Sequence, residues 1–286
     1  MSSDSLLEKV KELRELTGVG FKDCKNAIDE NGGNIEKSIE YLRKKGIAKA
    51  SKKMGRIAAD GLVCISEKAN KFSIIEINSE TDFVAKNDDF IKFAEEISLI
   101  TLANSGKMED ILTTQMKNKK IVKDSLVDLI SKIGEKITLR RSSYIGSDDL
   151  KNFSYTHLPV KQNIGKIGVL LALESTKTRD ELINFGKQLS MHIAALNPLA
   201  INAENIDKTV LDKEKELISE ELKNSGKPDD IVKKISFGKL NKFKEDNSLM
   251  TQNWVIEPKK KVKEIINELN VSDLKVKEFY RIKIGE

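Results

Sequence analysis

The sequence has few of the residues on which catalytic and metal sites most often depend. Its 286 residues include only two histidines, His157 and His192, and two cysteines, Cys24 and Cys64, without a CxxC spacing. A disulfide framework and a histidine-rich metal site are therefore excluded, and a reduced, cytoplasmic compartment is expected. Neither GxxxxGK(S/T) nor GxGxxG occurs, which excludes the common phosphate-binding loops. We expect no metal, no cofactor and no enzymatic activity.

Long apolar runs and aromatic residues are also scarce. No stretch approaches the roughly 20 apolar residues of a membrane-spanning helix, and the polar start MSSD lacks the apolar core of a signal peptide. Aromatic residues make up 5% of the chain, so the core must consist mainly of Ile, Leu, Val and Ala. The net charge of +5, from 50 basic and 45 acidic residues, is too small to indicate nucleic acid binding. We expect a soluble intracellular protein without a membrane partner.

Periodic apolar patterns predict an α+β protein with antiparallel strands. Three short helical segments near the N-terminus make a marginal core, which favours a docking module over a bundle without a partner. Gly46 is expected to end the third of these helices. The predicted parts are a three-helix domain at 1–46, a basic linker at 47–60, a first core subdomain at 61–145 and a second at 146–286, with a projecting helical hairpin inserted at about 211–244.

The two core subdomains share a plan in the sequence. Residues 62–65 and 72–77 predict two paired strands, and residues 90–103 predict the helix that follows them. In the second subdomain, a predicted strand at 166–174 is followed by a predicted helix at 178–196. The apolar positions of the two helices match at a constant offset. This match suggests an internal duplication, although shared amphipathic patterning would give a similar pattern.

The most informative segment is the run NSETDFVAKN at residues 78–87. It places a carboxylate and a phenyl ring, Asp82 and Phe83, at the corner between a predicted buried strand and a predicted amphipathic helix. Such corners are exposed and often carry binding groups. Phe83 is therefore either a wedge for a partner or, with Asp82 as a helix cap, an anchor in the core.

Two other functions are possible but have weaker support. Cys24 with His192 would make a nucleophile and base, but Cys24 lies on the apolar face of a predicted helix, where a buried inert thiol is expected. RNA is the other candidate, because a basic run surrounds the linker and the predicted hairpin is rich in lysine. Aromatic residues do not alternate with these lysines, so direct nucleic acid binding is not expected and a solvated linker helix is preferred. The run comprises Lys44, Lys45, Lys49, Lys52, Lys53 and Arg56.

Five ordered motifs resemble those of the translation elongation factor Ts family, and the resemblance covers nearly the whole chain. A TDF triplet alone would be a weak signal, but five motifs in order at compatible spacing are specific. They are LRELTGVG at 13–20 leading into DCK at 23–25, AADGLV at 58–63, ETDFVAKN at 80–87, MHIAA at 191–195 and SGKP at 225–228.

This resemblance implies a nucleotide exchange factor that acts by binding. The N-terminal three-helix domain would be ubiquitin-associated-like, and the hairpin would be the family's coiled-coil projection. The partner would be elongation factor Tu, from which the family releases GDP. Thr81, Asp82, Phe83 and Val84 would displace Mg²⁺ from the nucleotide site of that partner, with Phe83 as a wedge between helices.

Further partner contacts are carried over from the resemblance one position at a time. Some members of the family have an additional C-terminal helical module, whereas this sequence ends just after a predicted strand, so we expect no such contact here. The alternative to an exchange factor is a basic RNA- or ribosome-associated protein without exchange activity. The implied partner contacts are Lys25, Ile167, Gly168, His192, Val255 and Ile256.

Overall fold

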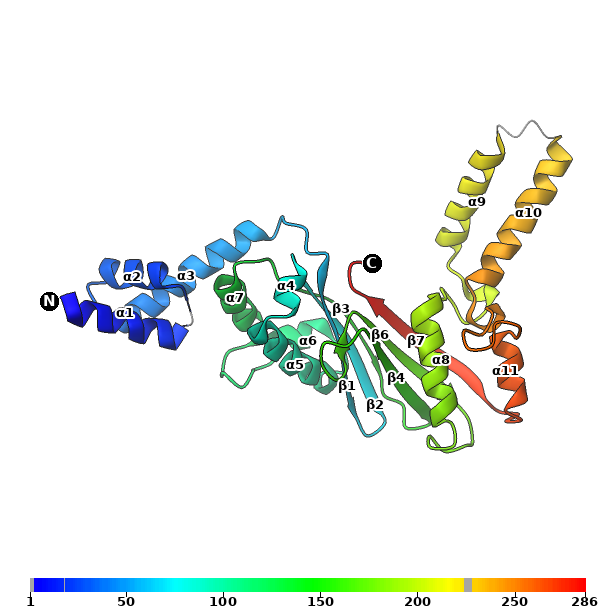
Figure 1. Ribbon diagram of the computed structural model, residues 1–286, viewed down its shortest axis with the longest axis horizontal. Helices are drawn as coiled ribbons and strands as arrows, with labels where there is room; N and C mark the ends of the chain where they lie inside the picture. The colour runs from blue at the N-terminus through cyan, green and yellow to red at the C-terminus, as the bar shows by residue number, and fades with distance from the viewer. Residues whose placement is uncertain (1–2, 18, 224–227) are drawn as a thin grey trace.

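The computed structural model describes residues 3–17, 19–223 and 228–286 of the chain. Gly18 and residues 225–227, which belong to two of the motifs above, lie outside the described residues. Three helices form a separate unit at one end of the molecule (Figure 1). Their bounds are α1 Ser3–Thr17, α2 Phe21–Glu30 and α3 Ile35–Lys53.

The prediction that Gly46 ends the third helix is wrong, because α3 continues to Lys53. A Cβ atom at Gly46 would lie 2.6 Å from Oγ of Ser131 in helix α7 (Val122–Ile133). Gly46 therefore permits the close approach of α3 to α7. The first half of the expected linker is helical, and the salt bridge from Arg43 to Asp124 (2.7 Å) fastens α3 to α7.

The centre of the molecule consists of two antiparallel sheets (Figure 1). The first has the strand order β3-β2-β1-β5, and β1 and β2 are the strands predicted from the apolar runs. The second has the order β4-β6-β7. The strand bounds are β1 Asp60–Lys68, β2 Lys71–Ser79, β3 Thr138–Ile145, β4 Leu150–His157, β5 Ile164–Gly165, β6 Ile167–Glu174 and β7 Lys275–Lys283.

The sheets pack face to face, and helices cover their outer faces. Alternation along β1 sends Val63 and Ile65 toward the second sheet and Leu62 and Cys64 toward the helices. The central strands are therefore buried on both faces, which explains why they appear in the sequence as nearly continuous apolar runs. The helices over the first sheet are α4 Asp82–Ala85, α5 Asp88–Ala103, α6 Met108–Thr113 and α7.

The second sheet is covered by α8 (Ile183–Leu196) and α11 (Val262–Glu268). Between them in the sequence, α9 (Lys208–Lys223) and α10 (Asp229–Asp246) project from the core as an antiparallel hairpin (Figure 1). The hairpin helices are therefore longer than the predicted 211–244. Within the three described ranges, no helix has both the length and the apolar character needed to cross a bilayer.

The α+β class with antiparallel strands is confirmed. In each half, one long helix packs on an antiparallel strand pair, α5 on β1 and β2 and α8 on β4 and β6. The duplication itself, the ubiquitin-associated-like character of the first unit and the domain boundaries remain predictions.

Candidate functional site

The corner after β2 turns its two central apolar side chains in opposite directions. β2 ends at Ser79, and the single helical turn α4 follows directly. Val84 is buried in the core under the first sheet, whereas the ring of Phe83 is 79% exposed. The interpretation of Phe83 as a core anchor is therefore wrong. Val84 anchors the corner, and Phe83 is presented to solvent.

Asp82 does not cap a helix. The N-cap of α4 is Thr81, and the N-cap of α5 is Asn87, whose side chain accepts hydrogen bonds from the N–H groups of Asp89 (3.0 Å) and Phe90 (3.3 Å). The half-exposed carboxylate of Asp82 pairs instead with Lys86 at 2.9 Å. The hydrogen bond from Lys86 lowers the pKa of Asp82, so this carboxylate is charged at neutral pH beside the exposed ring.

A carboxylate from the α7–β3 turn holds the backbone of this corner. Glu135 accepts hydrogen bonds from the Thr81 N–H (3.0 Å) and the Thr81 hydroxyl (2.7 Å). The adjacent Glu80 accepts from the N–H of Lys136 (2.6 Å) and pairs with Arg56 at 3.3 Å. The hydrogen bond from the Lys136 N–H lowers the pKa of Glu80, and the charge of Arg56 acts in the same direction. Polar hydrogen bonds therefore hold the backbone that presents the exposed ring of Phe83.

Phe83 also borders a hollow of about 450 Å³ between the corner and the N-terminal unit. Val19 comes from the α1–α2 connection and Ile133 from the end of α7. The three-helix unit therefore lies beside the exposed ring. Lys25 is exposed on α2 but does not line this hollow.

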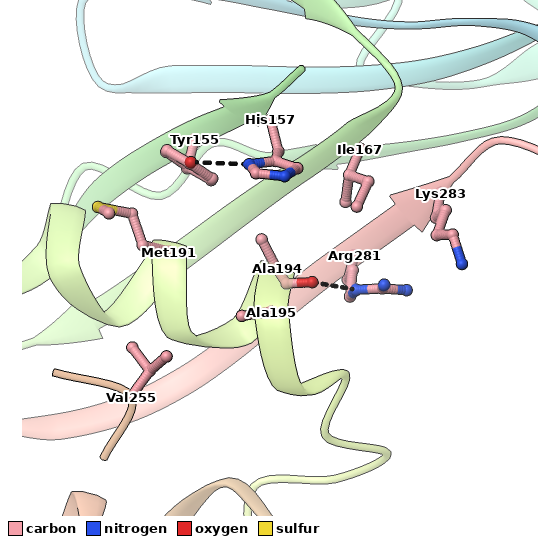
Figure 2. Close-up of a pocket in the computed structure, with 9 residues that line it drawn as sticks. All are labelled: Tyr155, His157, Ile167, Met191, Ala194, Ala195, Val255, Arg281 and Lys283. Atoms are coloured by element: carbon pink, nitrogen blue, oxygen red, sulfur yellow. Dashed lines mark hydrogen bonds between the residues drawn. The ribbon is translucent and has the colours of Figure 1, made fainter. Parts of the chain in front are cut away.

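A second hollow, of about 390 Å³, lies on the second sheet (Figure 2). Ile167 of β6 and Val255 both line it, so the structure brings these two predicted contacts together. Met191 of α8 and Arg281 of β7 contribute an apolar and a cationic side chain. Val255 is 39% exposed and the following Ile256 53% exposed, so the segment presents apolar surface as the first corner does.

His192 supports this second surface from beneath. Its side chain is fully buried in this structure, and its contact with a partner stays a prediction. Its Nδ1 accepts a hydrogen bond from the Val255 N–H (3.2 Å), which leaves the proton on Nε2 to donate to Oε1 of Gln252 (3.1 Å). Burial lowers the pKa of His192, so the ring is neutral at pH 7. His192 thus fixes the backbone at Val255.

Gly168 is also buried, between the two sheets. A Cβ atom there would lie 2.7 Å from both Ile74 Cδ1 and Val63 Cγ1. Its absent side chain therefore permits close packing of β6 on the first sheet. Gly168 directly follows Ile167 in the sequence. Ile167 lines the second hollow, whereas Gly168 is buried beneath it.

The structure does not bring the predicted nucleophile and base, Cys24 and His192, together. Cys24 packs in the core of the N-terminal unit, and burial raises the pKa of its thiol. His192 is bonded to Gln252 and stacks on Trp254, with ring centroids 5.1 Å apart. Across the part of the chain that the structure describes, no group of three or more His, Cys, Asp or Glu residues is arranged to hold a metal ion.

Comparison with known proteins agrees with the ordered motifs. The family model described as "Elongation factor TS" matches residues 80–286, which contain both surfaces. The chain is 45% identical over 250 residues to elongation factor Ts of Allorhizobium ampelinum, covering 87% of this chain and 81% of that protein. It is 41% identical over 281 residues to elongation factor Ts of Rhizobium meliloti, covering 97% and 92%. The chain therefore belongs to the elongation factor Ts family of translation elongation factors.

Proposed function

We propose that the protein is a guanine-nucleotide exchange factor for elongation factor Tu. It would bind the GDP-bound form in the cytoplasm and promote GDP release during translation elongation, without making or breaking a covalent bond. The observation that carries the proposal is the presentation of Phe83, a largely exposed ring on a short turn whose neighbouring residues are anchored. Family membership supplies the class of partner.

The corner offers two properties suited to opening a magnesium site. Burial of the Phe83 ring against a partner supplies about 2 kcal/mol or more toward binding. Asp82 carries a negative charge one residue away. Inserted beside Mg²⁺ and phosphates, Asp82 and Phe83 would shift the elements that coordinate the ion, while Thr81 and Val84 would take part by holding the turn that presents them. GDP then loses the cation that neutralises its phosphates.

Exchange by this route is a case of linkage. GDP with Mg²⁺ and the exchange factor favour different arrangements of the same site, so each weakens the binding of the other by the same factor. The factor speeds GDP release because the ternary complex is less stable than either binary complex. GTP can then bind the nucleotide-free partner and displace the factor.

The surface around Ile167 is proposed as a second contact with the same partner. Ile167, Val255 and Ile256 would supply apolar contacts there, with His192 and Gly168 shaping the surface from beneath. Lys25, exposed on α2, would contact the GTPase domain of the partner.

The organisation of the chain is part of the same proposal. The ubiquitin-associated-like domain at 1–46 would dock beside the corner, and the linker at 47–60 would connect it to the duplicated core. The two core subdomains, 61–145 and 146–286, would each carry one apolar contact surface. The hollow between Val19 and Phe83 supports the placement of the docking domain.

Four cations of the basic run have side chains that the structure describes, and each of these four is engaged by a group of the protein itself. Lys44 pairs with Glu40 (2.8 Å), and Lys45 pairs with Asp23 (3.3 Å). Lys53 donates to the carbonyl of Gly134. Arg56 is paired with Glu80, as described above. Nucleic acid binding depends on unpaired protein cations that neutralise phosphates and so release the counterions of the nucleic acid. These pairs therefore favour a protein partner.

Co-purification with elongation factor Tu tests the proposal. We expect a stable complex with the nucleotide-free partner, which added GDP and Mg²⁺ dissociate in a concentration-dependent way. A complex indifferent to nucleotide would show a passive binder, and no complex at all would remove the partner. A gel shift with RNA at low salt tests the alternative function, and we expect no salt-sensitive binding.

A further inference from the structure

The double hydrogen bond from Thr81 to Glu135 has a consequence for function. We propose that Glu135 is a positioning residue that holds the corner carrying Asp82 and Phe83 in its binding conformation before a partner arrives. Glu135 lies 54 residues away in the sequence but accepts both donors of Thr81, at 3.0 Å from N–H and 2.7 Å from the hydroxyl. A charged acceptor makes each of these bonds stronger than one between neutral groups.

Helix α4 needs support from outside its own sequence. It has four residues, so it is one turn and too short to be stable alone. Thr81 occupies the N-cap position, but its hydroxyl makes no capping bond to α4 and donates to Glu135 instead. The turn is held at one end by Glu135 and at the other by the buried side chain of Val84. Phe83, between them, contributes little to the fold because its ring is exposed.

The turn that carries Glu135 is itself fixed from several sides. Gly134 ends α7 with φ +90°, a left-handed conformation that glycine adopts without strain. The N–H of Lys136 donates to Glu80 (2.6 Å), and its Nζ donates to the carbonyls of Met54 (2.7 Å) and Arg56 (2.8 Å). Glu135 therefore belongs to a clasp, defined as Arg56, Glu80, Thr81, Glu135 and Lys136, that joins the end of the N-terminal unit to the corner.

The clasp affects affinity because the partner binds only those molecules in which the corner already has its ordered conformation. If the corner is ordered only part of the time, the apparent dissociation constant rises in inverse proportion to the fraction that is ordered. Once the partner is bound, it orders the same residues, so the saturating rate is preserved. This step rests on the exchange function proposed above. Loss of Glu135 is then expected to raise the half-saturating concentration of the factor and to leave the saturating GDP release rate nearly unchanged.

Hydrogen exchange on the free protein tests positioning without any partner. In Glu135→Ala, peptides covering residues 80–87 are expected to exchange at least tenfold faster, while peptides from α5 keep wild-type rates. Thr81→Val removes only the hydroxyl donor and is expected to give about a threefold increase. The control is Glu109→Ala, an exposed glutamate on α6 whose carboxylate has no hydrogen bond or ion pair with any described residue. Unchanged exchange at 80–87 in both Glu135→Ala and Thr81→Val overturns the proposal.

Kinetics of GDP release then separate positioning from general damage. Glu135→Ala should raise the half-saturating concentration about tenfold, equivalent to about 1.4 kcal/mol, with a saturating rate within twofold of wild type. Glu135→Gln should recover to within threefold, because its carbonyl accepts from the Thr81 N–H and its amide donates to the Thr81 hydroxyl. An equal loss in both parameters, without rescue by glutamine, contradicts positioning. If wild-type protein does not accelerate release, the exchange function fails, and the hydrogen exchange result still decides the role of Glu135.

Discussion

The molecule presents apolar side chains from two short segments, and it holds the two in different ways. At the first corner, Phe83 is supported by charged groups that remain partly in contact with solvent, since the side chain of Arg56 is 53% exposed. At the second, Val255 is supported by the neutral and fully buried ring of His192. In both segments the exposed residue is separate from the residue that fixes its backbone.

The two supports should differ in what happens to the protein when each is removed. The charged clasp lies at the edge of the fold, so water can replace part of its hydrogen bonding and only the corner is expected to loosen. His192 lies inside the core of the second subdomain, against Trp254 and Gln252, so its loss leaves buried groups without partners. We therefore expect defects at the first support to appear in exchange kinetics and defects at the second to appear in stability.

The largest expected effect follows from removal of the exposed ring. Phe83→Ala should slow GDP release from elongation factor Tu by tenfold or more while leaving unfolding unchanged, because the ring makes little contact within the free protein. Stopped-flow release of fluorescent GDP measures it. Phe237→Ala is the matched control, since Phe237 on α10 is 68% exposed but far from the corner in sequence. Equal losses in the two variants would show that the effect is not specific to the corner.

Removal of the buried support should come next in size. His192→Ala is expected to lower the free energy of unfolding by roughly 2–4 kcal/mol, because a cavity forms and the Val255 N–H loses its acceptor. Urea denaturation followed by the fluorescence of Trp254, the single tryptophan of the chain, measures this change directly. His157→Ala, at an exposed position, should change it by less than about 0.5 kcal/mol. Similar values for the two histidines would refute the buried role.

Acidification should weaken the two supports one after the other, first His192 and then the clasp that contains Glu80. The folded pKa of His192 is depressed, so its contribution is complete above its ordinary value of 6.5 and is lost as the pH falls below that value. The folded pKa of Glu80 is also depressed, and its contribution is lost only below the ordinary 4.5. Trp254 fluorescence should therefore change at a higher pH than hydrogen exchange at 80–87, corrected for its intrinsic pH dependence. The reverse order would contradict these assignments.

The smallest effect is expected from the exposed arm of the clasp. Arg56→Ala removes one ion pair in contact with solvent, so the free energy of unfolding should fall by less than about 1 kcal/mol. Added salt should reduce the difference from wild type further. Chemical denaturation at two salt concentrations measures both changes. A loss above about 2 kcal/mol would contradict the description of this ion pair as a weak contact at the edge of the fold.

Much of the core could be predicted from the sequence, because buried strands and amphipathic helices leave local patterns. The runs at 62–65 and 72–77 lie within β1 and β2, and the run at 90–103 lies within α5. Gly46 misled the prediction because a glycine that ends a helix and one that lets two helices touch look alike in sequence. Only the position of Ser131, 85 residues later, distinguishes them.

The candidate site was only partly predictable, because contacts between residues far apart in the sequence leave no local pattern. The sequence placed Asp82 and Phe83 at a corner but left open whether the ring faced the core or solvent. Glu135 and Gln252 gave no signal, since their partners Thr81 and His192 are 54 and 60 residues away. The burial of His192 beneath Val255 depends on tertiary packing, so its motif could not show that its ring holds the backbone at Val255.

The central claim, that Phe83 and its neighbours release GDP by displacing Mg²⁺, is tested most directly by varying the ion. GDP release from elongation factor Tu is measured with wild type and Phe83→Ala, at millimolar Mg²⁺ and after chelation with EDTA. We predict a deficit of tenfold or more in Mg²⁺ that shrinks to within about twofold in EDTA, because no ion remains to be displaced. A deficit of the same size under both conditions would contradict the account.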